Sequence, residues 1–176
     1  MLVHRERIRL PVFLPIERLM KQPLFAIALV STALPLFAQS SAFAVHNNAE
    51  LAQVESSLKS EAEKSPTGEA GQILDDQSSH WLIMVYRAHT GEAELHNEWA
   101  DEILVRSGTL TVVYGGTMSP QHPFGKRPGE FHSSTMEGGT TQVLHAGELM
   151  HIPARVPHWV KVAPGESSCY LVVKER

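Results

Sequence analysis

The chain has 176 residues, with 15 Lys and Arg against 19 Asp and Glu, and a single cysteine. A chain of this length forms one domain with a core of its own. Its acidic balance excludes a protein that binds nucleic acid or an anionic membrane through a basic surface. The lone Cys169 excludes an internal disulfide, and its apolar surroundings predict a buried side chain.

The N-terminal 44 residues have the pattern of a secretory signal peptide. An almost unbroken apolar run from Leu24 to Phe37 follows Lys21 and precedes the small residues Ala42 and Ala44. This order is typical of a signal peptide, here cleaved after Ala44. The run is shorter than the ~20 apolar residues of a membrane-spanning helix. We therefore expect a periplasmic or secreted protein with no stable membrane span after cleavage; an uncleaved membrane anchor is the alternative.

Residues 1–19 do not fit this signal peptide. They are rich in arginine, and Met20 followed by Lys21 would begin a compact signal peptide. We expect that translation starts at Met20 and that residues 1–19 are a gene-start artefact. Five of the Lys and Arg and two of the Asp and Glu precede the cleavage site, so residues 45–176 hold 10 basic and 17 acidic residues, a formal charge of −7.

Residues 45–72 are predicted to form a short helix and a linker. The apolar residues of segment 49–64 repeat at intervals of three and four, as on one face of an amphipathic helix; they are Leu51, Val54 and Leu58. Asn48 is the expected N-cap. Because a lone helix of this length is rarely stable, the helix packs on the outside of the domain, contacts a partner, or is only marginally formed.

From residue 73 to 176 the sequence predicts an all-β domain. Short apolar or alternating runs separated by Gly and Pro favour an antiparallel sandwich or barrel. The runs are 80–87, 92–96, 102–105, 110–114, 141–144, 149–152, 159–162 and 169–173. The interruption 117–139 holds three Pro and four Gly. It is predicted to be a loop, either a mobile lid over a site or a disordered excursion.

Two segments carry possible metal ligands at strand ends. In the first, His96 and Glu98 stand two apart, and Asp101 precedes Gly108 by six intervening residues. In the second, five residues separate Gly147 from Pro153, and His158 follows. On a strand, residues i and i+2 face the same side. The same alternation places Asp101 on the interior face with Ile103 and Val105, and Glu102 on the outer face with Arg106.

These segments resemble the two motifs of the cupin superfamily. The first motif is Gly, five residues, His-x-His, three or four residues, Glu, six residues, Gly. The second is Gly, five residues, Pro-x-Gly, two residues, His, three residues, Asn. The second motif fits well, with Arg155 where a Gly is usual and Val162 where an Asn is usual. In the first motif an Asp replaces the Glu, and the second His falls on Glu98.

The resemblance implies a jelly-roll β-barrel, preceded by the signal peptide and the short helix, with one divalent metal ion at the barrel mouth. The ligands of the family carry over to His96, Glu98, Asp101 and His158. Two imidazoles with carboxylates suit Mn, Fe or Zn. A hydrogen-bonded cluster of the same groups without a metal is the alternative.

A small polar organic ligand is expected inside the barrel, against Trp99, His151 and Trp159. The resemblance includes dioxygenases, isomerases and decarboxylases, so a metal-dependent enzyme of one of these types is one interpretation. The other is a non-catalytic module that binds a small ligand or a metal. The resemblance also implies a homodimer.

Overall fold

The structure, a computed structural model, describes residues 43–126 and 128–176. The expected translation start at Met20 and nearly all of the predicted signal peptide lie outside these residues. The elements are a helix and twelve strands: α1 (Asn48–Ala62), β1 (Glu69–Asp76), β2 (His80–Arg87), β3 (Ala93–His96), β4 (Ala100–Tyr114), β5 (Thr117–Met118), β6 (His122–Pro123), β7 (Glu130–Ser133), β8 (Met136–Glu137), β9 (Thr140–His145), β10 (Leu149–Ile152), β11 (His158–Lys161) and β12 (Ser168–Glu175).

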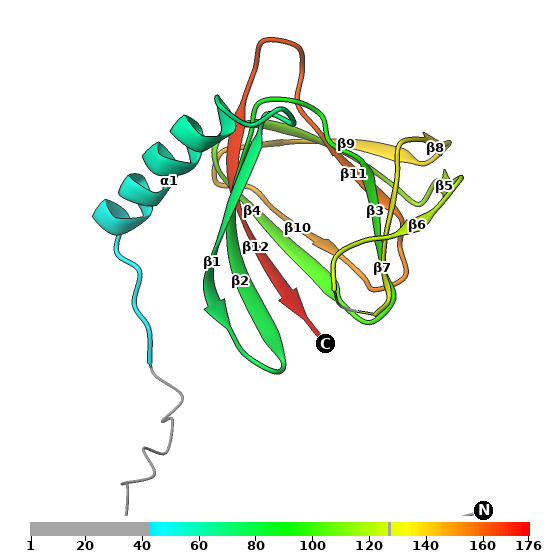
Figure 1. Cartoon of the computed structure of the whole chain (residues 1–176), viewed down its shortest axis with the longest axis horizontal. Helices are drawn as coiled ribbons and strands as arrows, with labels where there is room; N and C mark the ends of the chain where they lie inside the picture. Colours follow the sequence, from blue (N-terminus) through cyan, green and yellow to red (C-terminus); the bar gives the residue numbers. More distant parts are fainter. Residues whose placement is uncertain (1–42, 127) are drawn as a thin grey trace, which may run out of the picture. The chain divides into compact units, whose positions relative to one another are not determined.

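Nearly all strands join one curled antiparallel sheet. Its order is β1-β2-β12-β4-β11-β3-β7-β6, and both β9 and β10 also pair with β4. The strands curve around a common interior, with β4 and β12 on one side and β3 and β7 on the other (Figure 1). The short strands β5 and β8 pair with each other. This arrangement confirms the predicted all-β, jelly-roll type of barrel.

The long strand β4 connects the two halves of the sheet. The sequence predicted two strands here, 102–105 and 110–114, with a turn between them. The structure has one strand, with a bulge opposite Cys169 and Tyr170 and a left-handed Gly108 at φ +75°. The bulge inserts one residue, so the inward positions change from Ile103 and Val105 to the even-numbered residues that follow.

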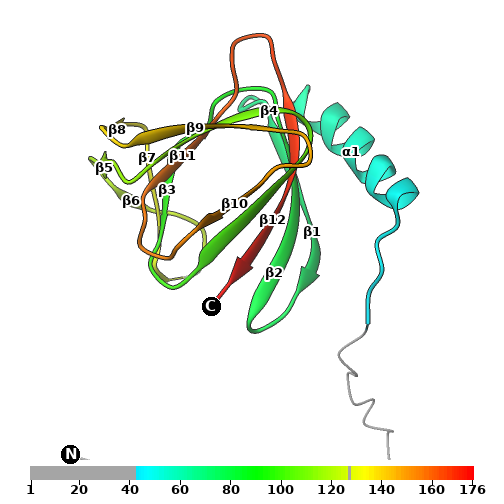
Figure 2. The same cartoon turned by 180° about the vertical axis from the view of Figure 1, so that it is seen from behind.

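The helix α1 packs against the outer face of β1 and β2 (Figure 2). Its buried side chains contact Met84, Tyr86 and Cys169 of the sheet; they are Leu51, Leu58 and Ala62. The N-cap is Asn47, one residue before the predicted one, and it forms a capping box with Glu50. Of the three alternatives, packing on the outside of the domain is therefore the correct one. None of the described helical residues forms a helix long and apolar enough to cross a membrane.

Two predicted boundaries differ from the structure. The strand-rich part begins at Glu69, so the linker after α1 is shorter than predicted. The segment 117–139 is not a plain loop, because it carries four short strands. One of them, β7, pairs with β3 along its whole length. Except for Pro123 of β6, the Gly and Pro residues of segment 117–139 lie outside these strands, and this composition concealed the pairing.

The core lies inside the barrel. It combines inward residues of β4, β9, β10, β11 and β12 with Val162; they are Ile103, Val105, Leu110, Val112, Leu144, Ile152, Val160, Val162, Tyr170 and Val172. Cys169 faces α1 instead and is fully buried, as predicted. The apolar core fills one part of the interior and leaves the other part to a cluster of polar side chains.

Candidate metal centre and ligand cavity

Three directly opposed cross-strand pairs build a buried polar cluster. His96 on β3 faces Glu130 on β7, and Glu94 on β3 faces His158 on β11. On the other side of the interior, Asp101 on β4 faces Lys174 on β12. Directly opposed side chains on one face of a sheet lie in contact. The register of the sheet therefore brings together six polar residues from five strands.

Within this cluster, Glu94, His96 and His158 place one ligand atom each within 4.8 Å of the others. The two imidazole rings are 5.1 Å apart between their centroids. Asp101 adjoins both histidines: its Oδ2 lies 3.4 Å from His96 Nε2 and 3.5 Å from His158 Nε2. Two imidazoles and two carboxylates thus converge on one point of the barrel interior.

Both histidines are oriented through their Nδ1 atoms. His96 Nδ1 lies 2.6 Å from Glu130 Oε2, and His158 Nδ1 donates to the backbone carbonyl of Val156 at 3.0 Å. A carboxylate or carbonyl at Nδ1 fixes the proton there and leaves the Nε2 lone pair for a metal ion. Both Nε2 atoms face the same acid, Asp101, so both histidines are oriented to bind one metal ion.

The cluster shifts the pKa values of its members in favour of positive charge on the histidine and negative charge on the acids. Burial alone would lower the pKa of His96, but hydrogen bonds with Asp101, Glu130 and Glu94 raise it to about 11. Burial alone would raise the pKa values of Asp101 and Glu94, but both lie well below their usual range. The causes are hydrogen bonds with the histidines and the positive charge of Lys174.

The charges of the cluster fit a divalent cation. Glu94, Asp101 and Glu130 exceed the ammonium of Lys174 by two formal charges when both imidazoles are neutral; Arg87, 3.9 Å from Glu94, is offset by Glu69. One divalent ion would neutralise this charge, and carboxylates with imidazoles suit Mn, Fe or Zn. The raised pKa of His96 is a response to the same excess of negative charge. The residues therefore fit the metal that the cupin resemblance implies.

A cavity of about 270 Å³ adjoins the cluster inside the barrel. Glu94, Asp101, His158 and Lys174 line its polar end. Its other walls combine aliphatic side chains with charged and aromatic ones. They are Ile73, Ile83, Val85, Ile103, Val160 and Val172, and Glu69, Arg87, Phe124, His132 and Tyr170. Cavities that combine an apolar lining with a few converging polar groups are typical of small-molecule sites.

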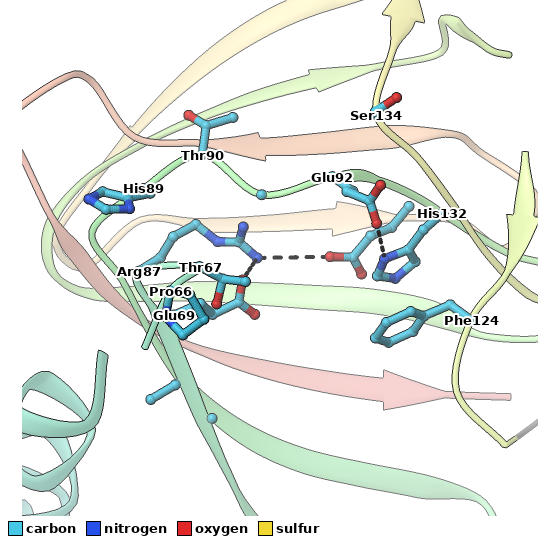
Figure 3. A pocket seen from close by; sticks show the side chains of 14 residues that line it. Pro66, Thr67, Glu69, Arg87, His89, Thr90, Glu92, Phe124, His132 and Ser134 are labelled. Atoms are coloured by element: carbon cyan, nitrogen blue, oxygen red, sulfur yellow. Dashed lines mark ion pairs between the residues drawn. The ribbon is translucent and has the colours of Figure 1, made fainter. Parts of the chain in front are cut away.

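A second cavity of about 640 Å³ shares its wall with the first and is drawn in Figure 3. The buried Arg87 lies between them, with its Nη2 2.8 Å from Glu69 and 3.9 Å from Glu94. Its Nε is 3.2 Å from the hydroxyl of Tyr170. On the opposite wall the ring of Phe124 stacks on His132 at 3.6 Å (Figure 3). Both rings come from the segment 117–139, which therefore borders the cavities.

Of the four predicted metal ligands, the structure brings His96, Asp101 and His158 together and leaves Glu98 out. Glu98 is exposed and pairs with Arg176 at 2.9 Å. The strand β3 ends at His96, so the alternation that was used to place Glu98 applies only on the N-terminal side, where Glu94 lies. The spacing Glu94, one residue, His96, four residues, Asp101, six residues, Gly108 also fits the first cupin motif. That second way of aligning the motif could have identified Glu94.

The three predicted ligand-contacting residues lie elsewhere. Trp99 packs against Trp81 at 5.0 Å, and Trp159 follows His158 on β11 and so faces the other side of the strand, where it donates to the carbonyl of Gly91. His151 is about half exposed and lies 2.5 Å from Glu102 on the outer face. None of the three lines either cavity.

Comparison with solved structures finds proteins that are partly similar to this chain. They include the polyketide cyclase RemF from Streptomyces resistomycificus, with 20% identity over 61% of this chain and a TM-score of 0.43. A cupin domain from Schizosaccharomyces pombe has 10% identity over 61% of this chain, and an oxalate oxidase has 18% over 63%, both with a TM-score of 0.44.

This likeness is partial. The alignment spans 64% of the cyclase and of the cupin domain and 52% of the oxalate oxidase, so it covers less than two thirds of each. No protein-family model matches the sequence. No curated protein is similar to it in sequence. The chemistry of the site therefore has to be argued from its own residues.

Proposed function

We propose that this cupin-like protein binds one divalent metal ion, Mn, Fe or Zn, inside its barrel. The observation that carries the proposal is the convergence of Glu94, His96 and His158 within 4.8 Å, with Asp101 beside them. The excess of carboxylates over cations and the Nδ1 contacts of both histidines support it further. Glu98, predicted from the sequence, is replaced by Glu94 in this proposal.

The adjoining cavity is the proposed site of a small organic ligand. A polar group of the ligand would face the metal and Lys174, and its remaining atoms would lie against the aliphatic walls. When bound, a divalent ion polarises substrate oxygens as a Lewis acid. A metal-dependent enzyme of the dioxygenase, isomerase or decarboxylase type is therefore the preferred function. Which of these reactions it catalyses depends on the ligand that the cavity binds.

The second candidate is a non-catalytic module that binds a small ligand or a metal. It is favoured by Lys174, which already satisfies His96 and Asp101 through hydrogen bonds. An enzyme requires an open coordination position beside the cavity, whereas a purely structural site has none. Turnover of oxygenated small molecules by the metal-loaded protein would distinguish the enzyme from the binding module.

Export through the predicted signal peptide is also part of the proposal, which places the protein in the periplasm or outside the cell. It is supported by the basic, apolar and small-residue pattern of residues 20–44 alone. The acidic charge of residues 45–176 suits a protein without an anionic partner. Self-association into a homodimer remains a proposal that rests on the cupin resemblance.

The metal proposal is tested by elemental mass spectrometry on protein purified without a His tag. We expect about one divalent metal ion per chain in the wild type. His158→Ala should lose it, because one of the converging imidazoles is removed. His145→Ala is the matched control, since this exposed histidine of β9 belongs to neither group of described residues that could hold a metal ion, and it should keep the metal. A wild-type protein that holds no stoichiometric metal after incubation with Mn²⁺, Fe²⁺ or Zn²⁺ contradicts the proposal.

A further inference from the structure

The ammonium of Lys174 contacts two of the four residues of the proposed metal site, His96 and Asp101. Its Nζ is 2.6 Å from His96 Nε2 and 2.8 and 3.0 Å from the two carboxylate oxygens of Asp101. The side chain is only 9% exposed and also lines the 270 Å³ cavity. The register of β12 against β4 places it directly opposite Asp101. Its position is therefore built into the sheet.

A metal ion and this ammonium need the same atom. Glu130 holds the Nδ1 side of His96, so the lone pair available to a ligand is that of Nε2. Lys174 Nζ lies 2.6 Å from Nε2 and so occupies the place of a ligand there. A metal–imidazole bond of about 2.0–2.1 Å needs the same place, and it forms once Nε2 has lost its proton. Asp101 is shared in the same way, since Lys174 contacts both of its oxygens. Occupation by the metal and by Nζ is mutually exclusive.

We propose that Lys174 is an internal competitor for the divalent metal ion, whose side chain fills the metal position and must swing into the cavity before His96 and Asp101 can bind metal. This inference rests on the proposed metal site and adds its regulation. Metal affinity is then set by the difference between the metal bonds and the hydrogen bonds of Lys174, so removal of Lys174 strengthens metal binding. A conventional supporting residue would have the opposite effect.

The test is isothermal titration of metal-free protein with Mn²⁺ and with Zn²⁺. Lys174→Met keeps the length of the side chain and removes its donors and charge. The variant should bind metal about 10- to 100-fold more tightly than the wild type, because the wild-type lysine must first give up charge-assisted hydrogen bonds to His96 and Asp101. Lys161→Met is the matched control: this lysine also lies on a barrel strand but covers Trp159 on the outside. It should bind metal like the wild type.

The outcomes separate the two proposals. If the wild type binds metal and Lys174→Met binds it equally or more weakly, the proposal that Lys174 competes with metal is overturned, and the proposed metal site stands. If neither protein binds metal, the metal site itself is overturned, and the competitor with it. Metal binding by the wild type together with 10- to 100-fold tighter binding by the variant supports both.

A measurement on the wild type covers the case in which Lys174→Met does not fold. Metal binding should release Nζ from His96 and Asp101 and expose it to an acetylating reagent through the cavity. Peptide mass spectrometry should therefore show acetylation of Lys174 several-fold faster with Zn²⁺ than with a chelator, while Lys161 reacts at one rate. An unchanged rate at Lys174 in metal-bound protein overturns the competitor.

Discussion

In the buried polar cluster, the pKa values of Asp101 and Glu94 are shifted in the opposite direction to that of His96. Those of Asp101 and Glu94 lie below their ordinary values of 3.8 and 4.5, whereas that of His96 is raised from 6.5 to about 11. A lowered carboxylate pKa stabilises the folded protein above pH 4.5, and this stabilisation is lost as the pH falls. A raised histidine pKa stabilises it fully below pH 6.5, and this stabilisation is lost as the pH rises toward 11.

The first prediction is that metal-free protein is most stable between about pH 4.5 and 6.5. The thermal midpoint, measured by circular dichroism in a chelator, should fall on both sides of this range. His96→Gln should flatten the decline between about pH 6.5 and 9. It removes the imidazole that keeps its proton in the folded protein and loses it in the unfolded chain over this range. Cys169 cannot account for that interval, since its pKa is raised from 9.0 to about 12. A midpoint that increases from about pH 7 to pH 9 would contradict the prediction.

At the scale of elements, α1 is attached to the barrel by a small apolar interface. Leu58 is 1% exposed and packs toward Met84 and Cys169 on the outer face of the sheet. The buried polar cluster lies on the interior side of the same sheet. The helix should therefore contribute to stability without contributing to the metal site.

We predict that Leu58→Ala lowers the free energy of unfolding by about 2–5 kcal/mol, as expected for a buried leucine. Metal affinity should stay at the wild-type value. Lys59→Ala, on the exposed side of the same helix turn, should change the free energy by no more than about 0.5 kcal/mol. Urea denaturation measures both variants. No loss of stability in Leu58→Ala would mean that α1 does not hold to the barrel in solution.

For the whole molecule, the prediction concerns export. The full chain, expressed in a Gram-negative bacterial host, should appear in the periplasmic fraction with Val45 as its first residue, as intact mass spectrometry would show. Ala44→Tyr should block cleavage, because the signal-peptide site requires a small residue before the cut. Translation from Met20 alone should give the same mature mass. A mature chain that retains residues 20–44 in the cytoplasm would contradict the export proposal.

Sequence patterns predicted much of the fold, because alternation and turn residues are local properties. The inward side of β4 was placed correctly: Asp101 is 3% exposed and lies on the same face as Ile103 and Val105. Gly147 and Pro153 correctly marked the turns on either side of β10. Arg155 adopts φ +68°. A left-handed conformation at this point explains why the cupin motif usually has a Gly there.

The sequence by itself determined the barrel type, the presence of a helix before it and the spacing that selects His96, Asp101 and His158. Only the tertiary structure decided that Glu94 rather than Glu98 joins them, since this depends on where β3 ends. Lys174 and Glu130 could not be found from the sequence, because they lie 78 and 34 residues from His96 and meet it only through pairing between strands. A local pattern specifies which face a side chain occupies, but the register of distant strands specifies which side chains it meets.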